Sequence, residues 1–162
     1  MSTLHMICGK IAAGKSTLAS RLSDAPATVL ISEDYWMSRL YKDELQSVAD
    51  YARYSARLRN AMGGHVETLL KAGLSVVLDF PANTPANRRW MRSLFENAGT
   101  DHRLHFLDTP EEVCKVRLRQ RNASGAHDFV VNDAEFAAIT RYFVPPSEQE
   151  GFETTVYREI AG

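Results

Sequence analysis

Near its N-terminus the chain carries the stretch Gly9-Lys10-Ile11-Ala12-Ala13-Gly14-Lys15-Ser16. Its spacing, G-x-x-x-x-G-K-S, is that of a phosphate-binding loop, whose glycines let successive backbone N–H groups turn toward a phosphate. The flanking sequence has the required order, because Leu4–Cys8 predicts a short buried strand and Ser16–Leu22 predicts a helix. We therefore expect a nucleotide-phosphate site here; the alternative is an ordinary glycine-rich turn between a strand and a helix.

The last residues of this loop carry its chemistry. A lysine at the position of Lys15 can bridge the β- and γ-phosphates, so we expect Lys15 to be catalytic as well as binding. The hydroxyl of Ser16 can ligate Mg²⁺. The residues expected to contact the nucleotide are Gly9, Lys10, Ile11, Ala12, Ala13, Gly14, Lys15, Ser16 and Thr17.

Composition limits the remaining possibilities. The 162 residues predict one domain spanning residues 1–162, and the net charge of −1 implies no general affinity for nucleic acid or for acidic membranes. Cys8 and Cys114 lack metal-ligand spacing, so we expect two small buried apolar side chains. The absence of a signal peptide and of a membrane-spanning apolar run predicts a cytoplasmic protein.

Strand and helix patterns alternate along the chain. Five apolar runs predict strands at Leu4–Cys8, Thr28–Ile31, Leu74–Asp79, Leu104–Leu107 and Thr154–Tyr157. Further helices are expected over 43–62, over 65–71 after a kink or break at Gly63-Gly64, over 85–98, over 111–121 and over 133–143. This alternation predicts an α/β fold with a mostly parallel sheet.

Three helix starts have recognisable caps. Thr84-Pro85 places a hydroxyl before a first-turn proline, and Gly99 predicts the end of that helix. Thr109-Pro110-Glu111-Glu112 predicts a similar start with a capping box. Asn132 is expected to cap the last helix, which the prolines at 145 and 146 must follow.

Two carboxylates follow neighbouring strands. Asp34 comes just after the second predicted strand, and Asp79 ends the third. Ligands of open α/β sheets bind at the carboxyl ends of the strands, so one carboxylate could hold Mg²⁺ through water and the other could accept a proton from a substrate hydroxyl. The alternative is that Asp34 caps a helix and Asp79 hydrogen-bonds a turn.

The basic residues after residue 80 have two possible roles. Arg117 and Arg121 are four residues apart on one helix face, which could meet the transferring phosphate or the adenine, or could simply be solvated. Val116 and Leu118 are expected to face the core. The polar stretch 122–128 predicts a mobile lid around 122–131.

Other groups remain ambiguous in the sequence. Three arginines could bind an anionic acceptor or lie scattered on the surface: Arg88, Arg89 and Arg92. His5 and His105 fall in predicted strands and are expected in the core or at a sheet edge. The aromatic residues between 35 and 54 could wall an acceptor pocket or pack a helical cap. His127 lies in the expected lid, and its role is open.

In this order the motifs resemble the small P-loop kinases of the AAA_33, zeta-toxin and polynucleotide-kinase-like group. The motifs are the phosphate loop 9–16, Ile31-Ser32-Glu33-Asp34-Tyr35, Val77-Leu78-Asp79-Phe80 and Arg117-Leu118-Arg119-Gln120-Arg121. The resemblance covers almost the whole chain. It implies a P-loop NTPase fold with a five-stranded parallel sheet in the order 2-3-1-4-5, of nucleoside-monophosphate-kinase type, and ATP with Mg²⁺ as the phosphoryl donor.

The resemblance also implies a role for each matching position. Lys15 and Ser16 would bind phosphate and metal, Asp34 would activate the acceptor and Asp79 would hold the metal in a Walker-B-like position. Arg117 and Arg121 match the lid arginines. An arginine often found shortly after the activating aspartate has no clear match, since Trp36 and Met37 follow Tyr35.

Together the sequence predicts a Mg-ATP-dependent phosphotransferase acting on a hydroxyl of a small-molecule acceptor, with no membrane partner. One alternative is a polynucleotide 5′-hydroxyl kinase, which the near-neutral charge argues against. The other is a nucleotide-binding switch or ATPase module that changes a partner surface without phosphorylating an acceptor.

Overall fold

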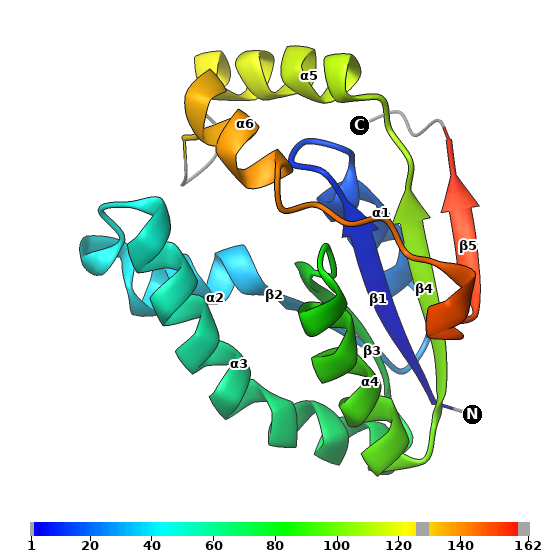
Figure 1. The fold of residues 1–162 in the computed structure, drawn as a ribbon. Coiled ribbons are helices and arrows are strands. Elements are labelled where there is room, and N and C mark those ends of the chain that lie inside the picture. Colours follow the sequence, from blue (N-terminus) through cyan, green and yellow to red (C-terminus); the bar gives the residue numbers. More distant parts are fainter. Residues whose placement is uncertain (1, 126–129, 159–162) are drawn as a thin grey trace.

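A computed structural model describes residues 2–125 and 130–158 of the chain (Figure 1). Its centre is a five-stranded sheet in which every neighbouring pair is parallel. The strands are β1 (Thr3–Gly9), β2 (Thr28–Ser32), β3 (Ser75–Pro81), β4 (Asp101–Leu107) and β5 (Thr154–Tyr157). Their order, β2-β3-β1-β4-β5, confirms the predicted topology.

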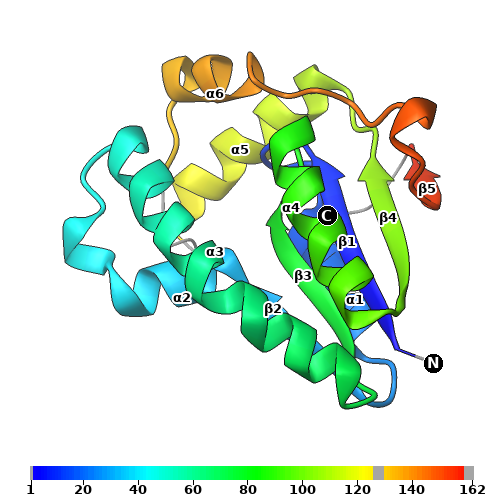
Figure 2. The same ribbon diagram turned by 60° about the horizontal axis from the view of Figure 1, so that its bottom comes forward.

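Helices cover both faces of this sheet. They are α1 (Lys15–Ser23), α2 (Glu33–Leu40), α3 (Val48–Lys71), α4 (Pro85–Ala98), α5 (Glu111–Ser124) and α6 (Asp133–Thr140), with 3₁₀ turns η1 (Lys42–Glu44) and η2 (Glu148–Glu150). The helices α3 and α4 pack on one face, whereas α1 packs on the other (Figures 1 and 2). The helices α5 and α6 lie near the carboxyl ends of the strands (Figure 1).

The strands are apolar on both sides because both sides are covered. Along β1, Leu4, Met6 and Cys8 enter the core beneath α3 and α4, while Ile7 enters the core shared with α1 and α5. All four of these side chains are fully buried, as is Cys114 of α5. The expectation that both cysteines are small buried residues is thereby confirmed.

Helix α3 corrects the expected break at Gly63-Gly64. It runs without interruption from Val48 to Lys71, with Ser47 as its N-cap, and residues 42–44 form the separate turn η1. Gly63 is buried, and a Cβ there would lie 3.4 Å from Leu94 Cδ2 of α4. The glycine therefore lets two helices approach each other, and tertiary packing outweighs its low helix propensity.

The predicted caps are confirmed at two helices and wrong at one. The hydroxyl of Thr84 accepts from Asn87 N, and Asn132 forms a capping box in α6, which ends at residue 140 and not 143. Helix α5 has no side-chain cap, because its N-cap residue is Pro110, whose side chain has no hydrogen-bond acceptor. The Thr109 hydroxyl instead donates to Ala13 O of the phosphate loop at 3.1 Å.

The faces of α5 differ partly from the prediction. Leu118 is buried as expected, but Val116 is 52% exposed. Within residues 2–125 and 130–158, no helix is both long and apolar enough to cross a membrane.

Candidate active site

The loop 9–16 has the curled backbone that its glycines predict. Both Ala12, with φ of 63°, and Gly14, with φ of 108°, adopt left-handed conformations. Gly9 serves a different need, because a Cβ there would lie 3.1 Å from Leu107 Cβ and 3.2 Å from Ala13 Cβ. The loop therefore depends on left-handed backbone conformations at Ala12 and Gly14, and on close packing of Gly9 against β4.

The N-terminus of α1 is prepared for an anion. Its cap residue is Gly14, which offers no side-chain acceptor, and the first turn has no acidic residue. The helices α2, α3, α4 and α6 instead begin with side-chain caps, from Ser32, Ser47, Thr84 and Asn132. The first N–H groups of α1 and the positive end of its dipole thus remain available to a phosphate.

The ammonium group of Lys15 folds back over the loop. Its Nζ donates to Gly9 O at 2.8 Å and to Lys10 O at 2.9 Å. Burial lowers the pKa of Lys15, and the carboxylate of Asp79 opposes this shift most strongly. Lys15 is thus a cation held at the loop by backbone carbonyls that a phosphate can replace.

Asp79, near the end of β3, lies beside Ser16, at the start of α1. The Ser16 hydroxyl donates to Asp79 Oδ2 at 3.4 Å. Burial raises the pKa of Asp79, while Lys15 and the hydrogen bond from Ser16 oppose the increase. A hydroxyl and a carboxylate next to a phosphate loop are oxygen donors that fit Mg²⁺, which prefers one or two carboxylates together with substrate phosphates.

Asp34 lies in the first turn of α2, two residues after the cap residue Ser32. Its side chain is exposed, and its Oδ1 accepts a hydrogen bond of 2.5 Å from the Tyr51 hydroxyl of α3. Its charge is close enough to raise the pKa values of Lys15 and Asp79. The two carboxylates expected at the site therefore differ in surroundings, one beside the loop and the other open to solvent.

Helix α5 brings its arginines to the same region. Arg117 Nη1 donates to Ala13 O at 3.4 Å, which is the carbonyl that also accepts from Thr109. Arg121 is half-buried, and its Nε has no hydrogen-bond partner among the residues that the structure describes. Burial lowers the pKa of Arg121, and Asp34 opposes the shift. Arg117 thus lies beside the phosphate loop, and Arg121 lies close enough to Asp34 to be affected by its charge.

The expected lid around 122–131 is only partly visible. Its first residues, 122–124, complete α5, and Asn122 Nδ2 donates to Val131 O at 2.6 Å. Residues 126–129, including His127, lie outside the described residues. The lid therefore stays a prediction.

Two supports of the loop were not recognised in the sequence. Asn83 Oδ1 accepts from Gly9 N at 3.0 Å, and its backbone carbonyl accepts from Val144 N at 2.8 Å. Thr109 supports the loop from the opposite side, through Ala13 O. The position of Asn83 just after β3 was a usable signal, whereas nothing local in the sequence points Thr109 toward the loop.

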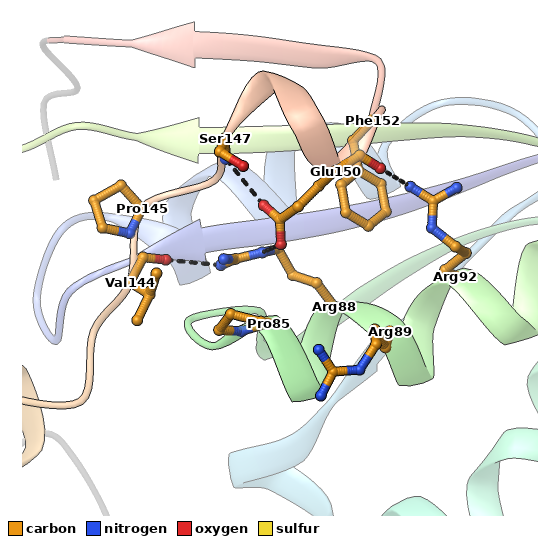
Figure 3. Close-up of a pocket in the computed structure, with 9 residues that line it drawn as sticks. All are labelled: Pro85, Arg88, Arg89, Arg92, Val144, Pro145, Ser147, Glu150 and Phe152. Atoms are coloured by element: carbon orange, nitrogen blue, oxygen red, sulfur yellow. Dashed lines mark hydrogen bonds and ion pairs between the residues drawn. The ribbon is translucent and has the colours of Figure 1, made fainter.

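The arginines of α4 line a pocket of about 310 Å³ whose described lining includes no residue of the phosphate loop (Figure 3). Arg88 is only 1% exposed and donates to Glu150 Oε1, Ala82 O and Val144 O, at 2.8 to 2.9 Å. Arg92 donates to Glu150 O. Arg88 and Arg92 therefore hold the C-terminal segment in place, a role that differs from both expectations, acceptor binding and a scattered surface position. Of the three arginines, only Arg89 is exposed.

The remaining ambiguous groups divide between core and surface. His5 Nδ1 lies 2.9 Å from His105 Nε2, which confirms their expected position within the sheet. Tyr41 and Tyr54 pack against each other with ring centroids 4.6 Å apart, as a helical cap requires. Tyr35 stays 57% exposed beside Asp34.

Comparison with protein families gives one match. The profile of AAA_33, described as an AAA domain, matches residues 4–146. The chain therefore belongs to this family and is a P-loop kinase-like protein. Comparison with curated proteins finds no match.

Solved structures of low sequence identity share the fold. A provisionally assigned kinase from Chloroflexus aurantiacus is 20% identical with a TM-score of 0.78, covering 97% of this chain and 85% of its own. Kti12 of Chaetomium thermophilum, in complex with ADP-AlF3, is 15% identical with a TM-score of 0.74. The match covers 96% of this chain and 88% of Kti12. The APS kinase CysC of Mycobacterium tuberculosis, in complex with AMPPNP and APS, is 24% identical with a TM-score of 0.56. The match covers 76% of this chain and 75% of the CysC chain.

Proposed function

We propose that this AAA_33 protein is a Mg-ATP-dependent phosphotransferase that transfers the γ-phosphoryl group of ATP to a hydroxyl of a small-molecule acceptor. One observation carries the proposal. The loop places Lys15 and the hydrogen-bonded pair Ser16–Asp79 at the carboxyl end of the sheet. A second carboxylate, Asp34, is exposed nearby. Two carboxylates in different surroundings suit a metal site and a separate base for the nucleophile.

Each group has a part in the proposed reaction. Phosphate oxygens would replace the loop carbonyls as acceptors for Lys15, and Ser16 and Asp79 would hold Mg²⁺. When bound, the metal neutralises charge on the β- and γ-phosphates. Asp34 accepts the proton of the attacking hydroxyl, and Arg117 with Arg121 stabilises the charge of the transferring group.

The chemical test compares two isosteric substitutions. Asp34→Asn keeps the shape of the carboxylate but is a poor proton acceptor, so transfer should fall roughly 10²- to 10⁴-fold with little change in ATP affinity. Asp79→Asn should weaken the Mg²⁺ dependence and nucleotide binding together. Transfer from labelled ATP and calorimetric titration of ATP measure the two effects, and intact transfer in Asp34→Asn would reverse the assigned roles.

The acceptor class requires a screen. Purified protein is incubated with labelled ATP and pooled metabolites, and separately with 5′-hydroxyl oligonucleotides. Labelled small molecules support the proposal, whereas a labelled oligonucleotide end would establish the polynucleotide alternative. ATP binding without any labelled acceptor, unaffected by Asp34→Asn, would favour the nucleotide-binding switch.

A further inference from the structure

Two adjacent carboxyl groups of α2 share one tyrosine hydroxyl. Tyr51 Oη, on α3, lies 2.8 Å from Glu33 Oε1 and 2.5 Å from Asp34 Oδ1. The other oxygen of Glu33, Oε2, accepts a hydrogen bond of 2.7 Å from Ser55 Oγ, one turn further along α3. The two helices are thus joined through a chain of polar groups that ends at the proposed base.

The number of hydrogen atoms constrains this chain. A tyrosine hydroxyl has one proton, and an ionised carboxylate has none to donate. Burial raises the pKa of Tyr51, and Glu33 and Asp34 raise it further, so the phenol keeps its proton. Tyr51 can therefore donate to only one of its two carboxyl neighbours, and the other must donate a proton to Tyr51 if both short contacts are hydrogen bonds.

Burial identifies the carboxyl that carries the extra proton. Glu33 is 2% exposed, whereas Asp34 is exposed. Burial raises the pKa of Glu33 and the charge of Asp34 adds to the increase, against the hydrogen bonds from Ser55 and Tyr51 and the charge of Arg59. A neutral Glu33 can donate from Oε1 to Tyr51 while its Oε2 still accepts from Ser55.

Asp34 is the solvent-exposed member of the chain, so water can solvate a negative charge there. It lies in the first turn of α2, where the helix dipole favours a negative charge. The cations that face it are Lys15, across the phosphate loop, and Arg121, on α5. Asp79 is the opposing carboxylate.

We propose that Glu33 is a protonated, buried carboxylic acid and that Tyr51 is a positioning residue, so that Asp34 alone carries the negative charge and is held in place to accept the proton of the attacking hydroxyl. This inference rests on the proposed function for its catalytic part. As the bond between the acceptor oxygen and the γ-phosphorus forms, the bond from that phosphorus to the leaving oxygen of ADP breaks. The hydroxyl proton moves to Asp34, and Tyr51 and Glu33 keep theirs.

The first experiment requires no activity. Protein labelled with ¹³C at its glutamate and aspartate carboxyl carbons is titrated by NMR, and Glu33→Gln identifies the Glu33 resonance by its loss. At pH 7 this resonance should have the chemical shift of a protonated carboxyl group. A resonance at the ionised position would overturn the inference whatever reaction the protein catalyses.

The second experiment tests the positioning role through turnover of Mg-ATP, with water or the acceptor from the screen as the nucleophile. Tyr51→Phe removes the hydroxyl and should lower kcat about 10- to 100-fold, with the KM for ATP changed by about twofold or less. Glu33→Leu should lower kcat similarly. Glu33→Gln should restore most of the loss, because an amide can donate to Tyr51 as a protonated acid does.

The matched control is Tyr54→Phe, which removes a hydroxyl from the same helix. Tyr54 Oη accepts from Arg53 and does not belong to the chain to Asp34. This variant should leave kcat unchanged. An equal loss in Tyr51→Phe and Tyr54→Phe, or no rescue by Glu33→Gln, would contradict the positioning role. If the wild-type protein turns over no ATP, the proposed function fails, while the NMR titration still decides the protonation state of Glu33.

Discussion

At the residue scale, Lys15 is the cation of the phosphate loop. Its ammonium group donates two hydrogen bonds to loop carbonyls, which phosphate oxygens can replace as acceptors. Lys15→Met keeps most of the side-chain length and removes the charge, so affinity for Mg-ATP should fall about tenfold or more, since hydrogen bonds to charged groups are each worth about 1.5–3 kcal/mol. Calorimetry measures the affinity.

Lys71→Met, at the exposed end of α3, is the matched control for Lys15→Met because it removes a lysine far along the chain from the loop. It should leave ATP affinity unchanged. Equal affinities of Lys15→Met and Lys71→Met would remove Lys15 from the proposed site.

Gly9 allows a second test at this scale. Its missing Cβ would meet Leu107 Cβ and Ala13 Cβ at 3.1 and 3.2 Å, and neither atom can move without its backbone. Gly9→Ala should therefore destabilise the fold by about 1–3 kcal/mol and shift the loop, which weakens ATP binding as well. Urea unfolding gives the stability, and an unchanged midpoint would contradict the close packing of the loop on β4.

At the element scale, α3 offers the opposite glycine substitution. Gly64 is exposed in the helix interior, and a Cβ there would meet nothing within 4 Å. Gly64→Ala should therefore stabilise the protein by roughly 0.5–1 kcal/mol. Gly63→Ala should gain less, because its Cβ would lie 3.4 Å from Leu94 Cδ2, at the near limit of ordinary van der Waals contact. Urea unfolding of both variants checks this order, and destabilisation by Gly64→Ala would show that the helix needs a glycine at that position.

The same helix shows what the sequence could and could not predict. The strands were predictable because they contain consecutive apolar residues, such as Val76, Val77 and Leu78. A strand that is buried on both faces of the sheet requires such a run. The predicted break at the glycine pair was wrong because Gly63 packs against α4, which is distant in sequence, and α3 continues through the exposed Gly64. Local propensity therefore predicted which elements form, and tertiary contact decided how far α3 extends.

The candidate site divides in the same way. Lys15, Ser16 and Asp79 follow local patterns, and the structure brings them together. Thr109 resembled a helix cap and contacts the loop instead, and Tyr51 was one aromatic residue among several. Residues whose roles depend on contacts between distant elements leave no local signal, so their positions became visible only in the folded chain.

At the scale of the whole molecule, strand order explains how these groups meet. The central strand β1 carries the phosphate loop between β3, which ends with Asp79 nearby, and β4, which leads to α5 and its arginines. The C-terminal segment returns across the sheet and is tied to α4 through Arg88 and Glu150, whose ion pair is 2.9 Å long. The phosphate loop, Asp79 and the arginines of α5 therefore all take their positions from the same sheet.

A histidine pair makes the stability of that sheet depend on pH. His105 Nε2, on β4, lies 2.9 Å from His5 Nδ1 on β1, and its Nδ1 lies 2.8 Å from the Tyr157 hydroxyl on β5. Burial lowers the pKa of His105 to about 4, with further lowering by the charges of His5 and Arg103. The folded chain therefore holds a neutral imidazole across three strands at a pH where an unfolded histidine is already protonated.

The direction of the pH effect follows from these two pKa values. An unfolded histidine has a pKa of about 6.5, so between about pH 6.5 and pH 4 the unfolded state binds a proton that the folded state excludes, and stability falls as pH falls. His105 contributes on the order of 3 kcal/mol to this loss. The raised pKa values of Glu33 and Asp79 act oppositely, because these groups destabilise the folded state less as pH falls.

The contribution of His105 is isolated by comparing wild-type protein with His105→Gln in urea unfolding between pH 7.5 and pH 4.5. Glutamine can hydrogen-bond but does not titrate, so the stability advantage of the wild type should shrink as pH falls through this range. His65→Gln, at an exposed position of α3, is the control and should follow the wild-type curve. If the difference between wild type and His105→Gln stays constant with pH, the buried imidazole is not the group that titrates, and the pH dependence must come from other groups.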